Sequence, residues 1–333
     1  MIACTLRLLT SFVCLALSLL AAADSPSQGP GASPTVLIVV GAAGEEEFGL
    51  QFKKWAAQWE RTVQQAGAKA LIVGTEPAAQ TNDLARFKGL LLAEPNESAS
   101  ELWLVLIGHG TFDGKEARFN LRGPDLGATE LSAWLQPFRR PLAVIDASSS
   151  SGPFLSKLSA PGRVVITATR SGYEQNFARF GQHLAEAIAD PQADLDKDGQ
   201  TSLLEAFLLA SRRTAEWYAT EGRLATEHAL LDDNGDGRGT PADWFRGVRA
   251  TKRAADGAAL DGLRAHQFHL IRSEPEQKLS LELRAKRDEL ELAVGKLRES
   301  KPQLVEDEYY RRLEELLLQL ARLYQTNRTP GFE

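Results

Sequence analysis

Short apolar runs spaced along the first half of the chain constrain its fold more than any other feature of the sequence. Residues 36–40 form a continuous, β-branched run, as expected for a strand buried on both faces of a sheet. Similar runs predict further strands at residues 70–73, 102–107, 142–145 and 163–167. Helical segments are expected between them at residues 48–66, 82–93 and 129–135. This alternation predicts an α/β fold, a three-layer sandwich around a mostly parallel sheet.

The first 23 residues carry the features of a secretory signal peptide. One early basic residue, Arg7, precedes an apolar run over residues 8–20 and three small residues that end at Ala23. The run is short for a transmembrane helix. We therefore expect cleavage after Ala23 and a secreted or periplasmic protein, with an uncleaved membrane anchor as the alternative. Residues 24–34, rich in Ser, Pro and Gly, predict a flexible leader.

The cysteine content excludes several kinds of chemistry. The chain has 2 cysteines, Cys4 and Cys14, and both lie in the predicted signal peptide. The mature chain is therefore expected to have no disulfide, no thiolate zinc site and no cysteine nucleophile. The net charge of −6 and the absence of a basic stripe argue against nucleic acid as a partner.

Small and polar residues follow two of the predicted strands. The run at residues 102–107 continues into Gly108-His109-Gly110, and the run at residues 142–145 continues into Asp146-Ala147 and four serines that end at Gly152. Ligands of open α/β sheets bind outside the carboxyl ends of the strands. If the two strands are neighbours, both loops face one crevice.

These two loops resemble those of the legumain and caspase class of cysteine peptidases, and the resemblance extends over residues 36–184. In that class the second loop carries the nucleophile in the pattern Asp/Glu-Ala-Cys-x-Ser-Gly. Counting back from Ser151 and Gly152 places Ser149 at the cysteine position, or Ser148 if the register slips by one residue. The resemblance implies that His109 and Ser149 are the catalytic positions and that the amide of Gly110 belongs to the oxyanion hole.

A serine in this position changes the chemistry, because its hydroxyl is not ionised at neutral pH and needs an oriented general base. No orienting group is visible in the sequence. We therefore expect a domain without cysteine-peptidase activity that binds a peptide or protein in the cleft. The alternatives are a serine-nucleophile hydrolase on the same fold and a structural calcium-binding envelope protein. In the simplest interpretation His109 is only a turn residue, and the serines form a solvated loop or a helix start.

A second motif predicts a calcium site. Residues 194–205 fit the twelve-residue EF-hand loop, with Gly199 at the sharp turn and helices expected on both sides at residues 180–189 and 203–218. Oxygen ligands at this spacing favour Ca²⁺ over softer metals. The predicted ligands are Asp194, Asp196, Asp198, Gln200, Ser202 and Glu205. The alternative is an acidic, capped turn without metal.

A weaker copy of the motif follows the first. Its predicted ligands are Asp232, Asn234, Asp236, Thr240 and Asp243. The last of these is a shorter acid than the usual glutamate, and Thr240-Pro241 is also typical of a helix N-cap, so a plain turn is the alternative. Calcium in the first loop is expected to stiffen the fold. The four histidines at 183, 228, 266 and 269 show no ligand spacing and are expected to be surface or packing residues.

The C-terminal third has a different character. The α/β domain is expected over residues 35–250, with the EF-hand-type insertion at 190–245, and a helical hairpin over 251–333. Pro302 separates two amphipathic segments. Their apolar stripes are Leu279, Leu283, Leu290, Val294 and Leu297, then Val305, Tyr309, Leu313, Leu316, Leu320 and Leu323. We expect the pair to pack together or to serve as a coiled-coil arm for self-association or for docking another protein.

Overall fold

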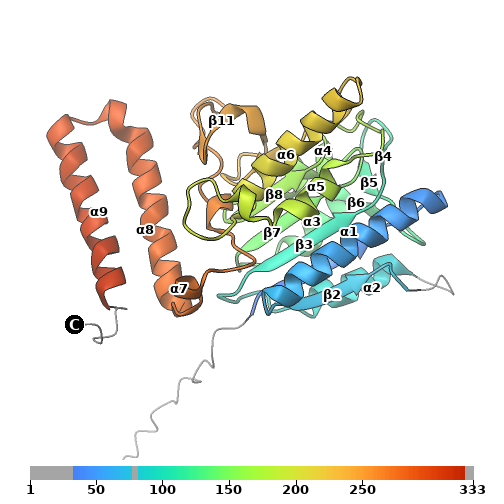
Figure 1. Cartoon of the computed structure of the whole chain (residues 1–333), viewed down its shortest axis with the longest axis horizontal. Coiled ribbons are helices and arrows are strands. Elements are labelled where there is room, and N and C mark those ends of the chain that lie inside the picture. The colour runs from blue at the N-terminus through green and yellow to red at the C-terminus, as the bar shows by residue number, and fades with distance from the viewer. Residues whose placement is uncertain (1–32, 77–81, 327–333) are drawn as a thin grey trace, which may run out of the picture. The chain divides into compact units, whose positions relative to one another are not determined.

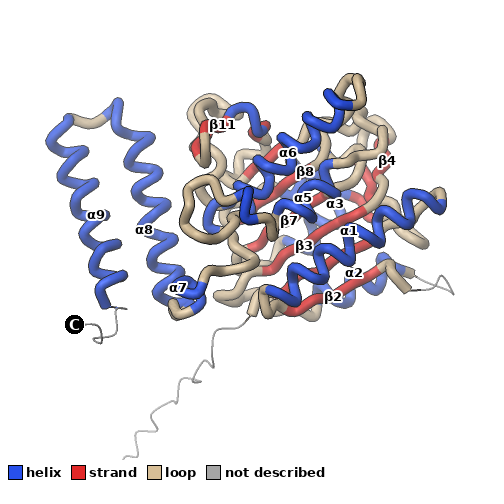
Figure 2. The backbone as a smooth tube through the Cα atoms, viewed as in Figure 1, coloured by secondary structure: helices blue, strands red, loops and turns tan. Residues whose placement is uncertain are grey.

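A seven-stranded sheet forms the centre of the protein in the computed structural model, which describes residues 33–76 and 82–326. The strand order is β10-β9-β8-β7-β3-β1-β2 (Figures 1 and 2). The strands are β1 (Thr35–Val40), β2 (Lys69–Val73), β3 (Leu102–Ile107), β7 (Leu142–Asp146), β8 (Arg163–Thr167), β9 (Leu230–Asp232) and β10 (Thr240–Pro241). The pairs among the first five are parallel, whereas β9 and β10 add an antiparallel edge. The predicted mostly parallel sheet is confirmed. The predicted signal peptide lies outside the described residues.

Helices cover both faces of this sheet and make the predicted three layers. One face carries α1 (Glu46–Gln65), α5 (Phe180–Ala187) and α6 (Leu203–Thr220), which Figure 1 shows lying over the sheet. The other face carries α2 (Asp83–Leu92), α3 (Ala128–Leu135) and α4 (Gly152–Leu158). Phe52, Trp59 and Phe207 belong to the core on the first face, and Phe87 and Phe154 to the core on the second.

The two cores explain why the strand sequences are continuously apolar. Successive side chains of a strand point to opposite faces. In β1, Ile38 packs into the core under α1 while Leu37 and Val39 pack into the core over α2, and all three are fully buried. A polar residue at any of these positions would lose its hydration without gaining a partner.

The register of the sheet brings the two loops of interest together. Strands β3 and β7 are direct neighbours, with Leu106 opposite Asp146. A small sheet that the sequence did not predict follows β3: β4 (Gly110–Phe112), β5 (Ala117–Phe119) and β6 (Leu126–Gly127). The position of this small sheet requires the backbones at Gly41 and Asn120 to lie close together, because a Cβ atom at Gly41 would lie 2.5 Å from the carbonyl oxygen of Asn120.

The segment after the sheet returns to the main core. It contains the 3₁₀ turns η1 (Pro191–Ala193), η2 (Ala242–Trp244) and η3 (Ala265–Gln267), and the short strands β11 (Phe245–Arg246) and β12 (Arg249–Ala250). Ala265, Phe268 and Leu270 are buried in the core that α6 shares with the sheet. Residues up to 270 therefore complete the α/β unit.

The two long C-terminal helices are present, after a short one. They are α7 (Glu274–Gln277), α8 (Leu281–Ser300) and α9 (Glu306–Thr326), with Pro302 in the 3₁₀ turn η4 (Lys301–Gln303) between the last two. Of the predicted stripes, Leu290, Val294, Leu297, Tyr309 and Leu323 are buried. Val305 is 75% exposed, because it precedes α9 instead of facing α8. Among the described residues, no helix is both long and apolar enough to cross a membrane.

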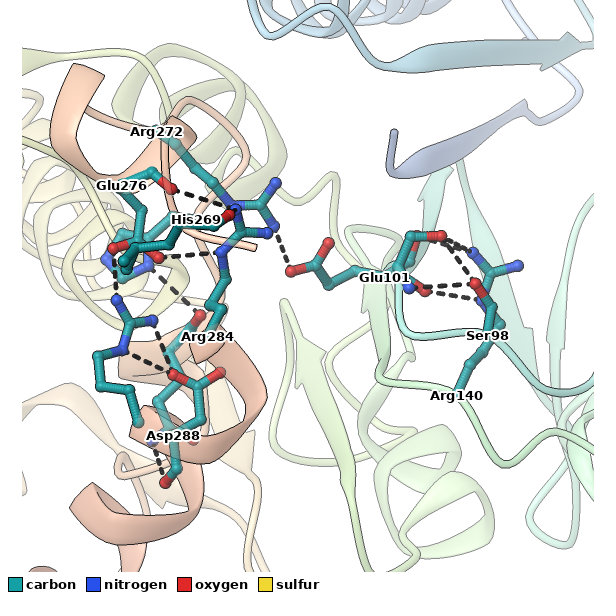
Figure 3. A network of polar contacts seen from close by, with 12 residues as sticks. Ser98, Glu101, Arg140, His269, Arg272, Glu276, Arg284 and Asp288 are labelled. Carbon is teal, nitrogen blue, oxygen red and sulfur yellow. Dashed lines mark hydrogen bonds and ion pairs between the residues drawn. The ribbon is translucent and has the colours of Figure 1, made fainter. Parts of the chain in front are cut away.

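A chain of charged residues joins these helices to the sheet (Figure 3). Arg272, just before α7, forms an ion pair with Glu101, just before β3. On one side, Arg140 donates to the backbone carbonyl of Glu101 at 3.2 Å. On the other side, Glu276 in α7 pairs with Arg284 in α8 at 3.0 Å. All these side chains are largely buried, so each charge depends on its neighbours for compensation.

Candidate functional site

His109 lies in the turn between β3 and β4, inside an aromatic pocket. Its half-buried ring has its centroid 4.9 Å from that of Phe48, 5.0 Å from Phe52 and 6.0 Å from Phe177. Burial lowers the pKa of the imidazole, and the backbone of Ala43 and the charge of Glu45 oppose this only in part. The imidazole is therefore predominantly neutral at pH 7.

The serine loop after β7 turns its hydroxyls inward. The Ser149 hydroxyl donates to the Gly110 carbonyl oxygen at 3.2 Å and accepts from the Gly110 N–H at 3.1 Å. All four serines are 0–1% exposed, so the expectation of a solvated loop is wrong, although Ser151 does sit at the start of α4. Within the described residues no serine hydroxyl bonds to His109. The loop places the two positions in one region without forming a base–nucleophile pair.

Asp146 is a site residue that the sequence did not predict. It is fully buried at the end of β7, and its Oδ1 accepts from the Ser148 N–H at 3.1 Å and from the Ser148 hydroxyl at 2.6 Å. Its Oδ2 has no hydrogen-bond partner among the described residues. Burial raises the pKa of this carboxyl to about 7. The signal in the sequence was an acid directly after an apolar strand.

Residues after β8 form one wall beside the serine loop. Gly152 approaches this segment so closely that a Cβ atom would lie 2.4 Å from the Ser171 nitrogen. Tyr173 follows, 76% exposed, with its ring 5.2 Å from that of Phe112 in β4. Aromatic rings therefore lie on the surface beside the serine loop.

The first acidic loop forms a series of turns in which carboxylates accept hydrogen bonds from backbone N–H groups. Asp194 accepts from the N–H groups of Lys197 at 2.6 Å and Gly199 at 3.2 Å, and Asp196 and Asp198 each accept from the N–H two residues on. Their carboxylates converge, with ligand atoms within 4.8 Å of one another. The predicted helices lie on both sides, α5 with η1 before the loop and α6 after it.

Glu205 closes this loop from the first turn of α6. Its Oε1 accepts from the N–H groups of Leu195 at 2.7 Å and Asp196 at 3.4 Å, and its Oε2 accepts from the hydroxyl of Ser202 at 2.8 Å. Ser202 and Glu205 also form a capping box. A helix start brings the third residue back toward its cap, so position 12 returns to the loop.

The second acidic loop, between β9 and β10, has turn hydrogen bonds at the same positions as the first loop. Asp232 accepts from the N–H groups of Gly235 and Gly237, both at 3.0 Å. Asn234 and Asp236 each accept from the N–H two residues on, both at 2.8 Å. The positive φ angles also fall at positions 4 and 6 in both loops: Lys197, Gly199, Gly235 and Gly237.

Asp261 closes the second loop in the way that Glu205 closes the first. Its Oδ1 accepts from the N–H groups of Asp233 at 3.0 Å and Asn234 at 3.2 Å, and its Oδ2 accepts from the Thr240 hydroxyl at 2.6 Å. The predicted closing residue, Asp243, makes none of these bonds. Thr240 and Pro241 form the extended strand β10, and the 3₁₀ turn η2 that holds Asp243 begins only after them, so Thr240 is not the cap of a helix that would return Asp243 to the loop.

His266 is a further residue beside the first loop that the spacing of histidines did not reveal. Its Nε2 lies 3.1 Å from Oδ2 of Asp196, and together with Glu205 the two form a group with ligand atoms within 4.8 Å. This histidine was expected to be a surface or packing residue, but it also contacts an acidic residue of the first loop. Its sequence distance from the loop hid the contact.

No protein-family model and no curated protein matches the chain. Among solved structures, it is similar to the Drosophila initiator caspase Dronc, with 14% identity over 63% of this chain and 85% of that chain, and a TM-score of 0.41. Caspase-1 from Spodoptera frugiperda matches with 11% identity over 62% of this chain and 88% of that chain, with a TM-score of 0.39. Raptor from Chaetomium thermophilum matches with 10% identity over 48% of this chain and 17% of that chain, with a TM-score of 0.32. These likenesses concern the fold alone.

The buried carboxyl of Asp146 predicts a pH dependence of stability. Its pKa is about 7 in the folded chain against an ordinary value of 3.8, so the folded state holds the proton more tightly. The stabilising contribution is complete below about pH 4 and is lost as the pH rises through about 7. The parent protein should lose up to about 4 kcal/mol of unfolding free energy across this window relative to Asp146→Asn. Urea titrations at several pH values measure the unfolding free energy of both proteins. The same change of this free energy with pH in the two proteins would contradict the prediction.

Proposed function

We propose that the chain is a secreted or periplasmic calcium-binding protein in which two acidic loops hold Ca²⁺ to stiffen the α/β domain. The observation that carries this proposal is the shared hydrogen-bond pattern of the two loops. In each, the residue at position 1 accepts from positions 4 and 6, and a closing acid accepts from positions 2, 3 and 9. Two unrelated turns would have no reason to agree in this detail.

The donor set of the first loop fits a hard divalent cation. The carboxylates of Asp194, Asp196 and Asp198 converge, and the closing carboxylate of Glu205 is 1% exposed. Ca²⁺ takes six to eight oxygen ligands in flexible geometry. Bound there, with the backbone carbonyl of Gln200, the ion would neutralise these charges. It would also tie the end of α5 to the start of α6.

The second loop has buried acids that need compensation. Asp232 and Asp261 are 1% and 3% exposed, and in the described part of the chain no Lys or Arg forms an ion pair with either. Burial raises the pKa of both carboxyls, that of Asp261 to about 8 with the nearby Asp233 as a further cause. A cation would remove this penalty. It would join the β9–β10 edge to the segment around Asp261.

Removal of the closing charge in the first loop tests the main site. Glu205→Gln should weaken calcium binding by roughly tenfold or more, because affinity in such loops follows the number of ligand charges. The matched control is Glu216→Gln, the same change at an exposed position of the same helix α6. Isothermal calorimetry on the chelated protein measures both. A parent protein that gives no calcium heat and no rise in melting temperature would rule the proposal out.

The closing residue of the second loop can be identified by a paired substitution. Asp261→Asn should reduce the calcium stoichiometry from two ions to one, whereas Asp243→Asn should leave it at two, because only Asp261 contacts positions 2, 3 and 9. Calorimetry and equilibrium dialysis report this number. The opposite pattern, with loss only in Asp243→Asn, would show that the loop rearranges around the ion.

We further propose that the domain is legumain/caspase-like and that its crevice binds a peptide or protein without cleaving it. No cysteine occurs after Cys14, so no thiol is available at the crevice. The Ser149 hydroxyl, 1% exposed, is engaged by both the N–H and the carbonyl of Gly110. A nucleophile in this position would have to break both bonds and find a base.

A covalent probe distinguishes binding from hydrolysis. A fluorophosphonate probe should not modify Ser149, because a hydroxyl without a general base reacts too slowly. Mass spectrometry of the treated protein locates any modified residue. Labelling of Ser149 that disappears in His109→Ala would establish the serine hydrolase instead.

A further inference from the structure

A cavity lies at the amino ends of the central strands, away from the serine loop and the first acidic loop. It has a volume of about 850 Å³ and is bounded by α3, the end of α4 and the amino ends of β7 and β8. His109 and Ser149 follow the carboxyl ends of β3 and β7, so the cavity lies at the opposite edge of the sheet. Its size is in the range of cavities that hold small molecules.

The lining of this cavity is strongly basic. Of the residues that line it none is acidic, although the chain as a whole has a net charge of −6. Five cationic residues contribute: Arg139, Arg140, Lys157, Arg163 and Arg264. Arg140 is neutralised by Glu94 at 3.2 Å. The other four form no ion pair with a carboxylate anywhere in residues 33–76 and 82–326.

Arg163 is the most buried of the four cationic residues without an ion pair, with only 8% of its surface exposed. Its guanidinium donates to the carbonyl oxygens of Leu158 and, at 3.1 Å, of Leu135, which end α4 and α3. Its Nε–H is buried and has no hydrogen-bond partner in the described part of the chain. A buried cation held only by carbonyl dipoles is not compensated in charge. Burial and the nearby Arg139 accordingly lower the pKa of Arg163 to about 10.

The remaining cations reach the cavity from separate elements. Arg139 lies in the turn before β7, Lys157 near the end of α4, and Arg264 just before η3. Among the described residues, the side-chain charges of Lys157 and Arg264 have no hydrogen-bond or ion-pair partner, whereas Arg139 donates to the Gln136 carbonyl at 2.6 Å. Cations that approach from several directions suit a tetrahedral oxyanion better than a planar carboxylate, which one Arg fork can match.

We propose that this cavity binds a phosphorylated small molecule that carries at least two negative charges. Arg163 supplies positive charge at the buried end of the cavity, and Arg139, Lys157 and Arg264 donate to the phosphate oxygens and neutralise the rest of the anion. The site is independent of the proposed calcium sites in its chemistry. It adjoins the second loop, because Ser159, which lines the cavity, accepts from the N–H of Gly237 at 2.9 Å.

Inorganic pyrophosphate is the probe that tests this site. Calorimetry on the full chain in calcium-free buffer should show saturable binding of one pyrophosphate, weakened by added salt. The double variant Lys157→Gln with Arg264→Gln should bind about tenfold or more weakly, since it loses two charge-assisted contacts. Both side chains reach the surface, so the fold should survive, and circular dichroism checks it. Arg163→Met should abolish binding if it folds, but the double variant decides the question alone.

A matched control removes the same kinds of charge outside the cavity. Lys53→Gln with Arg246→Gln changes two exposed cations on α1 and β11 and should leave pyrophosphate binding unchanged. Equal weakening in this control, equal binding by the cavity variant, or no binding by the parent would overturn the proposal. Citrate that binds more tightly than pyrophosphate would overturn the assignment to phosphate.

Discussion

Burial of both faces of the central sheet is the constraint on which the rest of the structure depends. Helices cover each face, so strands such as β1 and β3 must be apolar along their whole length. Polar chemistry is therefore confined to the two edges where strands begin and end. The carboxyl edge carries His109 and the serine loop, and the amino edge carries the uncompensated charge of Arg163.

The two acidic loops show one turn geometry completed in two ways. In the first, the chain enters helix α6, whose capping box returns Glu205 to the loop. In the second loop, the chain continues into strand β10 and no capping box forms. Asp261, from a later segment, therefore accepts the hydrogen bonds from positions 2, 3 and 9. Burial of Asp261 beside Asp233 disfavours its charged form and raises its pKa to about 8. A cation bound in the second loop would favour the charged form and remove this penalty.

The loops after β3 and β7 lie together, and their hydrogen bonds hold the loops to one another. Ser149 joins the serine loop to Gly110, and Ser148 is held by Asp146. His109 is surrounded by phenylalanine rings and is predominantly neutral at pH 7. No serine hydroxyl among the described residues bonds to His109, and the Ser149 hydroxyl bonds only to the backbone of Gly110.

The sequence by itself predicted the five parallel strands, most of the helices and the first acidic loop, because these depend on residues close together in the chain. The apolar runs fixed where β1, β3, β7 and β8 lie, and the EF-hand spacing found the loop that ends at Glu205. Only the tertiary structure decided that Asp261 closes the second loop, that His266 lies beside Asp196, and that the serines are buried. Such contacts join segments far apart in the chain, where no local periodicity or spacing records the approach. They arise only when the packed core brings those segments together.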